Sequence, residues 1–281
     1  MTSTCGCSKA PPATTCARSP AGAVTVPDQD PEEVFGRDYL DFYAAELHDG
    51  LNDEEAELIS LLTNLAPGHR VLDLPCGHGR IAERLAARGA EVVGVDRSAT
   101  FLEHARASAA RRGVRVDYRR GDWHTLCMDG EFDVVVSWFT SFGYGDGDGV
   151  SDAALRAQME RLYAALRPGG LLLLETLNIH EPGLTDHESS TSKELEDERG
   201  RHLLVDRSRF DPNRGVLHVR RDVARSGQPT RSCRYALRLF SATELRSWLR
   251  DAGFVDTQAY GAEGEVFRVD SGRMVTVARR P

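Results

Sequence analysis

Short apolar segments alternate with helix-like segments along most of this 281-residue chain, and no other feature restricts the fold as strongly. Strands are predicted at residues 70–74, 91–95, 114–119, 132–137, 171–176, 254–260 and 274–278. Helices are predicted at residues 77–88, 98–112, 155–166 and 245–252. Strands that alternate with helices of ~10–15 residues form right-handed βαβ units around a parallel sheet. We therefore predict an α/β fold with a doubly wound parallel sheet and helices on both faces.

The alternation is interrupted at residues 178–240, between a predicted core strand and a predicted core helix. Strand-like patterns occur there at 202–210, 216–223 and 232–240, whereas residues 185–200 are polar and predicted to be mobile. We expect an inserted antiparallel β cap over residues 178–240 and a core over residues 67–177 and 241–281. Residues 31–66 are predicted to form N-terminal helices, and residues 1–30, which have almost no large apolar side chains, to be a disordered leader.

Composition excludes several classes of partner. There are 43 acidic and 35 basic residues, a formal net charge of −8, which disfavours nucleic acids because their binding depends on Lys and Arg. No apolar run approaches the ~20 residues of a membrane span, so no membrane partner is expected. No apolar signal-peptide core follows Met1, and we expect a cytoplasmic protein with reduced cysteines. Cys5, Cys7 and Cys16 lack a fourth ligand and a zinc-like spacing, so no metal site is predicted.

A glycine-containing loop after the first predicted strand marks a ligand site. Residues 77–82 read Gly-His-Gly-Arg-Ile-Ala and fit the dinucleotide fingerprint, with Asp96 at about the expected distance. Asp73, at the end of the strand, argues against a dinucleotide because its carboxylate would repel a pyrophosphate. Pro75 and Cys76 also replace glycines that would let a pyrophosphate approach. S-adenosylmethionine, which carries a sulfonium and an α-ammonium, is the expected cofactor, and an NAD(P)-dependent oxidoreductase is the alternative.

Acidic residues follow three successive predicted strands, at Asp73, Asp96 and Asp122. Ligands of doubly wound sheets bind outside the carboxyl ends of the strands, where these side chains would meet. Asp96 would accept the ribose hydroxyls in charge-assisted hydrogen bonds, and Asp122 with Trp123 would face the adenine. Each acid alone could equally be a helix cap or a turn residue, but three of them around one glycine loop favour a cofactor site.

Four segments together resemble the small-molecule branch of the class I S-adenosylmethionine-dependent methyltransferases. They read VLDLPCGHGR at 71–80, VDRS at 95–98, FDVVV at 132–136 and LRPGG at 166–170, and the resemblance covers residues 35–178 and 241–281. It implies a seven-stranded, mostly parallel sheet with a final antiparallel strand. It also implies roles for individual residues: Asp73, Pro75, Cys76, Gly77 and Gly79 at the methionine end, Asp96 at the ribose, Arg97, Asp122 and Trp123 at the adenine, Ser137, Trp138 and Phe139 beside the transferring methyl group, and Tyr39 and Tyr43 over the cofactor. For the two tyrosines, packing of the first helix explains the pattern equally well.

The expected methyl acceptor is a small organic molecule, such as a natural product or a sugar, methylated on O or N. Residues 137–140 read Ser-Trp-Phe-Thr and differ from the Asp/Asn-Pro-Pro-aromatic motif of nucleobase amino methyltransferases. A cap of about 60 residues after the fifth strand resembles the lid of enzymes that act on small metabolites. A catalytically inert methyltransferase fold that only binds its ligand is a further alternative, and the sequence leaves open whether the chain forms a homodimer.

Candidate catalytic and acceptor-binding residues carry weaker signals. His180, Tyr144 and His78 are the candidate general bases, although a solvated loop histidine would have the same sequence pattern. The cap is rich in arginine, and Arg207, Arg209 and Arg220 are candidates to clamp a carboxylate or phosphate on the acceptor. The alternative is a solvated basic face, because strand alternation would point these arginines away from the apolar residues.

Overall fold

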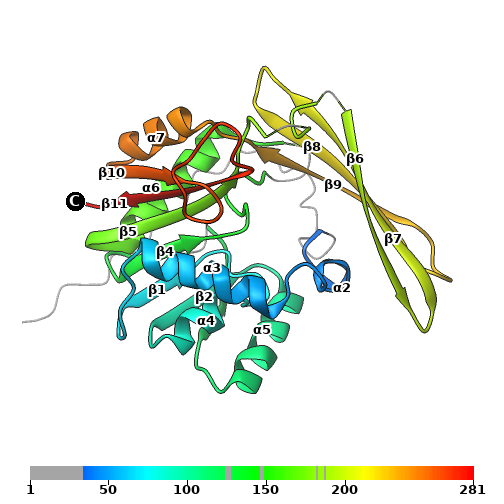
Figure 1. The fold of residues 1–281 in the computed structure, drawn as a ribbon, viewed down its shortest axis with the longest axis horizontal. Coiled ribbons are helices and arrows are strands. Elements are labelled where there is room, and N and C mark those ends of the chain that lie inside the picture. Colours follow the sequence, from blue (N-terminus) through cyan, green and yellow to red (C-terminus); the bar gives the residue numbers. More distant parts are fainter. Residues whose placement is uncertain (1–33, 124–127, 146–148, 182, 187) are drawn as a thin grey trace, which may run out of the picture.

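The computed structural model describes residues 34–123, 128–145, 149–181, 183–186 and 188–281. The predicted leader at residues 1–30, with its three cysteines, lies outside the described residues. Two sheets dominate the fold: a seven-stranded sheet in the order β10-β11-β5-β4-β1-β2-β3 and a four-stranded sheet in the order β6-β7-β8-β9 (Figure 1).

The seven-stranded sheet confirms the predicted doubly wound fold. Its strands are β1 (Arg70–Asp73), β2 (Glu91–Asp96), β3 (Asp117–Arg120), β4 (Phe132–Ser137), β5 (Leu166–Leu177), β10 (Val255–Tyr260) and β11 (Arg273–Arg279). Strands β1 to β5 pair in parallel, whereas β11 is antiparallel to both β5 and β10. The chain runs outward from β1 through β2 to β3 and then returns to β4 on the other side of β1. Ligand sites form where the strand order reverses in this way, here between β1 and β4.

Helices cover both faces of this sheet (Figure 1). On one face lie α3 (Asp49–Leu62), α4 (Ala82–Ala87) and α5 (Ala99–Arg112), and on the other α6 (Asp152–Ala165) and α7 (Ala242–Asp251). Ser98, Ser151 and Ser241 cap α5, α6 and α7, each accepting a backbone N–H three residues later. Such a cap stabilises a helix by about 1 kcal/mol.

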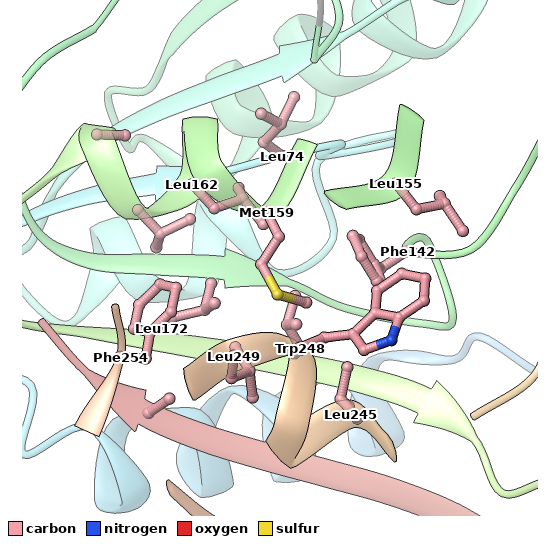
Figure 2. Close-up of a cluster of buried hydrophobic side chains, with 14 of the residues drawn as sticks. Leu74, Phe142, Leu155, Met159, Leu162, Leu172, Leu245, Trp248, Leu249 and Phe254 are labelled. Atoms are coloured by element: carbon pink, nitrogen blue, oxygen red, sulfur yellow. The ribbon is translucent and has the colours of Figure 1, made fainter. Parts of the chain in front are cut away.

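The core between α6, α7 and the sheet consists of buried apolar side chains (Figure 2). Leu155, Met159 and Leu162 recur at helical spacing on α6 and pack with Leu249 of α7 and Leu172 of β5. Full burial of one such side chain contributes about 1.5–3 kcal/mol. The periodicity that predicted these helices therefore reflects the face on which each of them packs.

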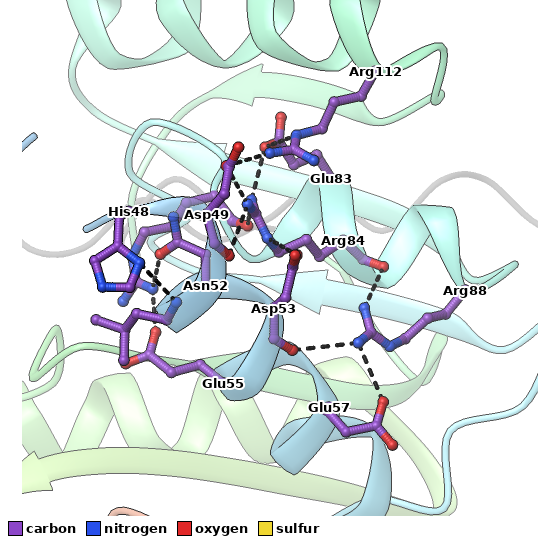
Figure 3. A network of polar contacts seen from close by, with 12 residues as sticks. His48, Asp49, Asn52, Asp53, Glu55, Glu57, Glu83, Arg84, Arg88 and Arg112 are labelled. Carbon is purple, nitrogen blue, oxygen red and sulfur yellow. Dashed lines mark hydrogen bonds and ion pairs between the residues drawn. The ribbon is translucent and has the colours of Figure 1, made fainter.

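An ion-pair network ties α3 to α4 and α5 on the opposite face (Figure 3). The buried guanidinium of Arg84 lies 2.6 Å from carboxylate oxygens of both Asp49 and Asp53. Arg112 of α5 lies 2.7 Å from Glu83, the neighbour of Arg84. The network fixes the helix that follows the glycine loop.

The four-stranded sheet is the predicted antiparallel cap, inserted after β5. Its strands are β6 (Glu188–Asp197), β7 (Gly200–Asp211), β8 (Val216–Ala224) and β9 (Arg231–Arg238). The prediction of a mobile segment at residues 185–200 is wrong, because residues 188–197 form β6. This strand lies at the edge of the sheet and is mostly exposed, so it lacks the apolar alternation by which a strand is recognised.

Helix α2 (Arg37–Tyr43) packs against the cap. Phe42 lies in an apolar cluster with Leu204 and Val223 of the cap, and Arg225 lies within 2.7 Å of both Asp38 and Asp41. In the part of the chain that the structure describes, no helix has the length and apolar character needed to cross a membrane.

Candidate functional site

A cavity of about 710 Å³ lies between the carboxyl ends of the core strands and the inner face of the cap. The glycine loop and the ends of β1, β2 and β3 form one wall, the loop after β4 a second, and α2 with the cap strands a third. It lies at the reversal of strand order, where a ligand is expected.

The two glycines of the glycine loop have different roles. Gly77 lines the cavity, and its N–H donates to Asp96 Oδ2 at 2.8 Å. Gly79 does not line it but has a φ of +83°, and a Cβ there would lie 2.3 Å from the Tyr118 hydroxyl and 2.8 Å from Ala105 Cβ. Gly79 therefore allows the loop to pack closely against α5 and β3, a structural role that differs from the predicted contact with a ligand.

Asp73 supplies a buried carboxylate to the cavity. The residue is 1% exposed, and among the described residues no hydrogen-bond partner faces its Oδ2 atom. Burial, reinforced by the nearby charge of Asp96, raises the pKa of Asp73 to about 8. A carboxylate in this state gains most from a cationic ligand group, which would compensate the charge that burial penalises.

Asp96 connects the glycine loop to α5. Its Oδ2 accepts the N–H of Gly77 and its Oδ1 that of Ser98, both at 2.8 Å. At the end of β3, Asp122 lies 3.7 Å from the Nε of Arg97, and both line the cavity together with Trp123. The structure thus brings the three acids from successive strand ends to one cavity.

Tyr39 and Tyr43 of α2 form an aromatic wall opposite the glycine loop. Their rings stack with centroids 4.3 Å apart, and the Tyr39 ring meets the edge of Phe101 at 5.4 Å. Both line the cavity, and Tyr39 is also a packed, buried residue. The two explanations left open by the sequence therefore both describe Tyr39.

The loop after β4 joins the cavity to the cap. Trp138, Phe139 and Tyr144 line the cavity, whereas Ser137 is fully buried outside it. Backbone hydrogen bonds run from Arg238 N to Gly143 O at 2.9 Å and from Gly145 N to Ala236 O at 3.1 Å. The loop is therefore held by the cap strand β9 as well as by β4.

The candidate bases are in different environments. His78 lines the cavity, but burial and the nearby Arg80 lower its pKa to about 3. Tyr144 also lines it, and burial raises its pKa well above the ordinary value. His180 is exposed and does not line the cavity. At neutral pH, His78 is therefore a weak base and Tyr144 is protonated, so neither has the pKa of an effective general base.

The structure does not bring Arg207, Arg209 and Arg220 to the cavity. They lie on the outer face of the cap, where Arg207 and Arg220 pair with Asp222. Residues of β8 alternate between faces, and Leu217, Val219 and Arg221 share the inner one. The outer arginines form the solvated basic face, as the alternation indicated.

Sequence reasoning missed Arg221, which does line the cavity. Its guanidinium is 4% exposed and donates to both oxygens of Asp206, at 2.8 and 2.7 Å, and to the Tyr43 hydroxyl at 3.1 Å. Its position in phase with Leu217 and Val219 was the signal available in the sequence. Arg273, at the start of β11, also lines the cavity and was not predicted.

Within the described residues, no cluster of three or more His, Cys, Asp or Glu side chains could hold a metal ion. Cys5, Cys7 and Cys16 lie outside those residues.

Comparison with known sequences shows similarity in the core. A family profile described as a methyltransferase domain matches residues 71–170. A ubiquinone biosynthesis O-methyltransferase from Chelativorans sp. is 38% identical over 112 residues, which are 40% of this chain and 41% of that protein. A protein of the same name from Brucella melitensis is also 38% identical over 112 residues, 40% of this chain and 42% of that protein. The chain thus matches about two fifths of the length of these curated relatives.

Similarity to solved structures extends well beyond that core. The CcbJ methyltransferase from Streptomyces caelestis superimposes with a TM-score of 0.67 and 26% identity, covering 82% of this chain and 95% of that one. An S-adenosylmethionine-bound amino pentose methyltransferase of calicheamicin biosynthesis from Micromonospora echinaspora superimposes with a TM-score of 0.64 and 25% identity. This match covers 87% of this chain and 97% of that one. Residues 71–170 thus match a methyltransferase domain, and the seven-stranded sheet together with these likenesses supports assignment of the chain to the class I S-adenosylmethionine-dependent methyltransferases.

Proposed function

We propose that this chain transfers the methyl group of S-adenosylmethionine to the nitrogen of a small organic amine. The observation that carries the proposal is the buried Asp73 carboxylate, whose Oδ2 lacks a partner among the described residues at the wall of the cavity. An α-ammonium is the complement of such a group, whereas a pyrophosphate would be repelled by it. This repulsion disfavours the alternative of an NAD(P)-dependent oxidoreductase, as it did when only the sequence was considered.

The residues at the core end of the cavity fit this cofactor. Asp73 would pair with the α-ammonium, and Asp96, at the carboxyl end of β2 on the cavity wall, would accept the ribose hydroxyls. Asp122 and Trp123 would face the adenine, and the tyrosines of α2 would cover the cofactor from the cap side. When bound, the cofactor supplies an electrophilic methyl group on a sulfonium.

The cap end of the cavity fits a small acceptor. Leu217, Val219 and Leu237 form an apolar surface there, with the rings of Tyr144 and Tyr235 5.7 Å apart beside it. The volume of about 710 Å³ lies within the roughly 300–1,000 Å³ of small-molecule sites. Enclosure by a cap does not suit a polymer, and the net charge of −8 does not suit a nucleic acid.

The protonation states of the lining residues favour an amine over an alcohol or phenol. An alcohol or phenol gains about 10²–10⁴ in rate from a general base, whereas a neutral amine attacks without one. Burial and the nearby Arg80 lower the pKa of His78 to about 3, which makes it a weak base, and burial keeps Tyr144 protonated. The main contribution of the protein is then to hold the amine in line with the methyl group, which is worth up to about 7–11 kcal/mol. The likeness to an amino pentose methyltransferase supports an amino sugar or a related natural product.

Binding and turnover test the proposal in two steps. Calorimetry should detect S-adenosylmethionine and S-adenosylhomocysteine but not NADH, and binding of NADH alone would refute it. Methyl-labelled S-adenosylmethionine is then incubated with matched amines and phenols, including amino sugars and their hydroxyl analogues. We expect the label to appear in amines. Label in phenols alone would refute the amine as the acceptor and indicate methylation of oxygen. Binding of S-adenosylhomocysteine without transfer to any compound would favour the inert binding protein.

A further inference from the structure

Two residues of the loop after β4 adopt a backbone conformation that non-glycine residues rarely hold. Phe139 has a φ of +60° and Thr140 a φ of +56°. Such conformations persist only where the surroundings impose them, and they concentrate at functional sites. Both residues line the cavity, shortly after the end of β4. What imposes this conformation therefore bears on how the site works.

Glu175 of β5 holds this loop at Thr140. Its carboxylate, 1% exposed, accepts the Thr140 N–H at 2.9 Å with Oε2 and the Thr140 hydroxyl at 3.3 Å with Oε1. A buried carboxylate requires a compensating charge, and Arg273 of β11 supplies it through Nη1, 3.0 Å from each oxygen. The residue opposite Glu175 in the antiparallel pairing is Val275, so Arg273 lies on the same face of the sheet, two residues away.

Arg273 also links the pair to the rest of the cavity wall. Its guanidinium lies over the Phe139 ring, 4.3 Å from the centroid, and the guanidinium of Arg80 lies over the same ring at 4.8 Å. Arg80 follows the glycine loop and is held by Asn52 of α3 at 2.8 Å. The loop after β4 is thus fixed against the segment that follows the glycine loop on one side and against β5 and β11 on the other.

We propose that Glu175 and Arg273 are positioning residues for methyl transfer, which hold Phe139 and Thr140 in place and thereby orient the acceptor toward the methyl group. The inference rests on the proposed function for its catalytic consequence. Glu175 acts through Thr140, so its loss should affect the rate of transfer and leave cofactor binding intact. Displacement of an oriented group by about 1 Å is enough to lower a rate about 100-fold.

Amide hydrogen exchange of the full-length protein tests the anchoring without any acceptor. Peptides that cover residues 138–145 should lose protection at least tenfold in Glu175→Gln, whereas peptides over β1 should exchange as in the wild type. Because this variant leaves the half-buried Arg273 charge without its carboxylate partner, a double variant, Glu175→Gln with Arg273→Met, is measured beside it. Arg279→Met, which removes an exposed arginine of the same strand, is the matched control and should behave as wild type. Unchanged protection of the loop in the double variant would overturn the proposal.

Kinetics then separate positioning from a purely structural role. The amine that the wild-type protein methylates fastest is assayed with labelled S-adenosylmethionine, and affinity for S-adenosylhomocysteine is measured in parallel. In the double variant kcat should fall about 100-fold, with cofactor affinity within about threefold and a melting temperature near that of the wild type. A kcat that follows the melting temperature across the variants would overturn the positioning role. If the wild type transfers no methyl group at all, the proposed function fails, whereas the exchange result still decides whether Glu175 anchors the loop.

Discussion

Replacement of Asp73 by Asn tests the buried carboxylate on which the cofactor assignment depends. Burial raises the pKa of Asp73 to about 8, whereas in the unfolded chain an aspartate titrates at about 3.9. Between these values the folded protein binds one more proton than the unfolded one, so the free energy of unfolding falls as pH rises. The slope is up to ~1.4 kcal/mol per pH unit, which amounts to ~2 kcal/mol between pH 6 and pH 7.5.

Thermal unfolding without ligand is the first assay. At about 2–4 °C per kcal/mol, the melting temperature of the wild type should fall ~4–8 °C further than that of Asp73→Asn between pH 6 and pH 7.5. Asp256→Asn, which removes an exposed carboxylate of β10, is the control and should keep the wild-type pH dependence. Equal slopes in the wild type and Asp73→Asn would refute the raised pKa.

Calorimetry of ligand binding is the second assay. An α-ammonium beside Asp73 stabilises the carboxylate, so binding of S-adenosylhomocysteine at pH 7 should release a proton from the wild type and none from this site in Asp73→Asn. Repetition in buffers of different ionisation enthalpy measures that proton. The variant should also bind 10- to 150-fold more weakly, or about 1.5–3 kcal/mol. Identical affinity and proton release in both proteins would refute the contact between Asp73 and the α-ammonium of the cofactor.

Three further predictions concern the loop, the cap and the ribose contact. Asp96→Ala should weaken S-adenosylhomocysteine binding about 10- to 150-fold in calorimetry, because it removes a charge-assisted acceptor, and an unchanged affinity would contradict the assignment. Arg221→Met should lower the free energy of unfolding by about 3 kcal/mol in denaturant titration, because it removes the guanidinium that compensates the largely inaccessible Asp206 carboxylate. Arg220→Met should change it by less than ~1 kcal/mol, and equal effects would place both arginines in the same environment. Gly79→Ala should destabilise the protein by more than ~2 kcal/mol, because its Cβ meets packed atoms, whereas Gly113→Ala, with a positive φ but open space, should cost about 1 kcal/mol; similar losses would show that only the backbone conformation matters.

Much of the core could be predicted because its signals are local. A strand such as β4 is a continuous apolar run, and a helix such as α6 repeats its apolar residues at the spacing of its buried face. The positions of Asp73, Asp96 and Asp122 followed in turn, because the carboxyl ends of parallel strands share one edge of the sheet. The sequence alone therefore indicated both the fold and which acids would gather at one cavity.

The edge strand and the inner face of the cap could not be predicted in the same way. Strand β6 carries no apolar alternation, because it is mostly exposed and pairs with one neighbour only. Alternation along β8 places Arg220 and Arg221 on opposite faces of the cap sheet. The arginines predicted to bind the acceptor were three that lie on the outer face. Arg221 faces the cavity because Asp206 of β7 lies beside it across the sheet and compensates its charge.

The sequence by itself determined the features that depend on the neighbours of a residue along one strand or helix. These features are the order of the elements, their buried faces and the strand ends at which functional side chains lie. Only the tertiary structure decided which groups meet from distant segments. Glu175 and Thr140 are 35 residues apart in the chain, and Glu175 and Arg273 are 98 residues apart. Their contact depends on the pairing of β5 with β11 and on the path of the loop after β4. The protonation states of Asp73 and His78 depend likewise on burial, and burial is a property of the packed fold and not of any short stretch of chain.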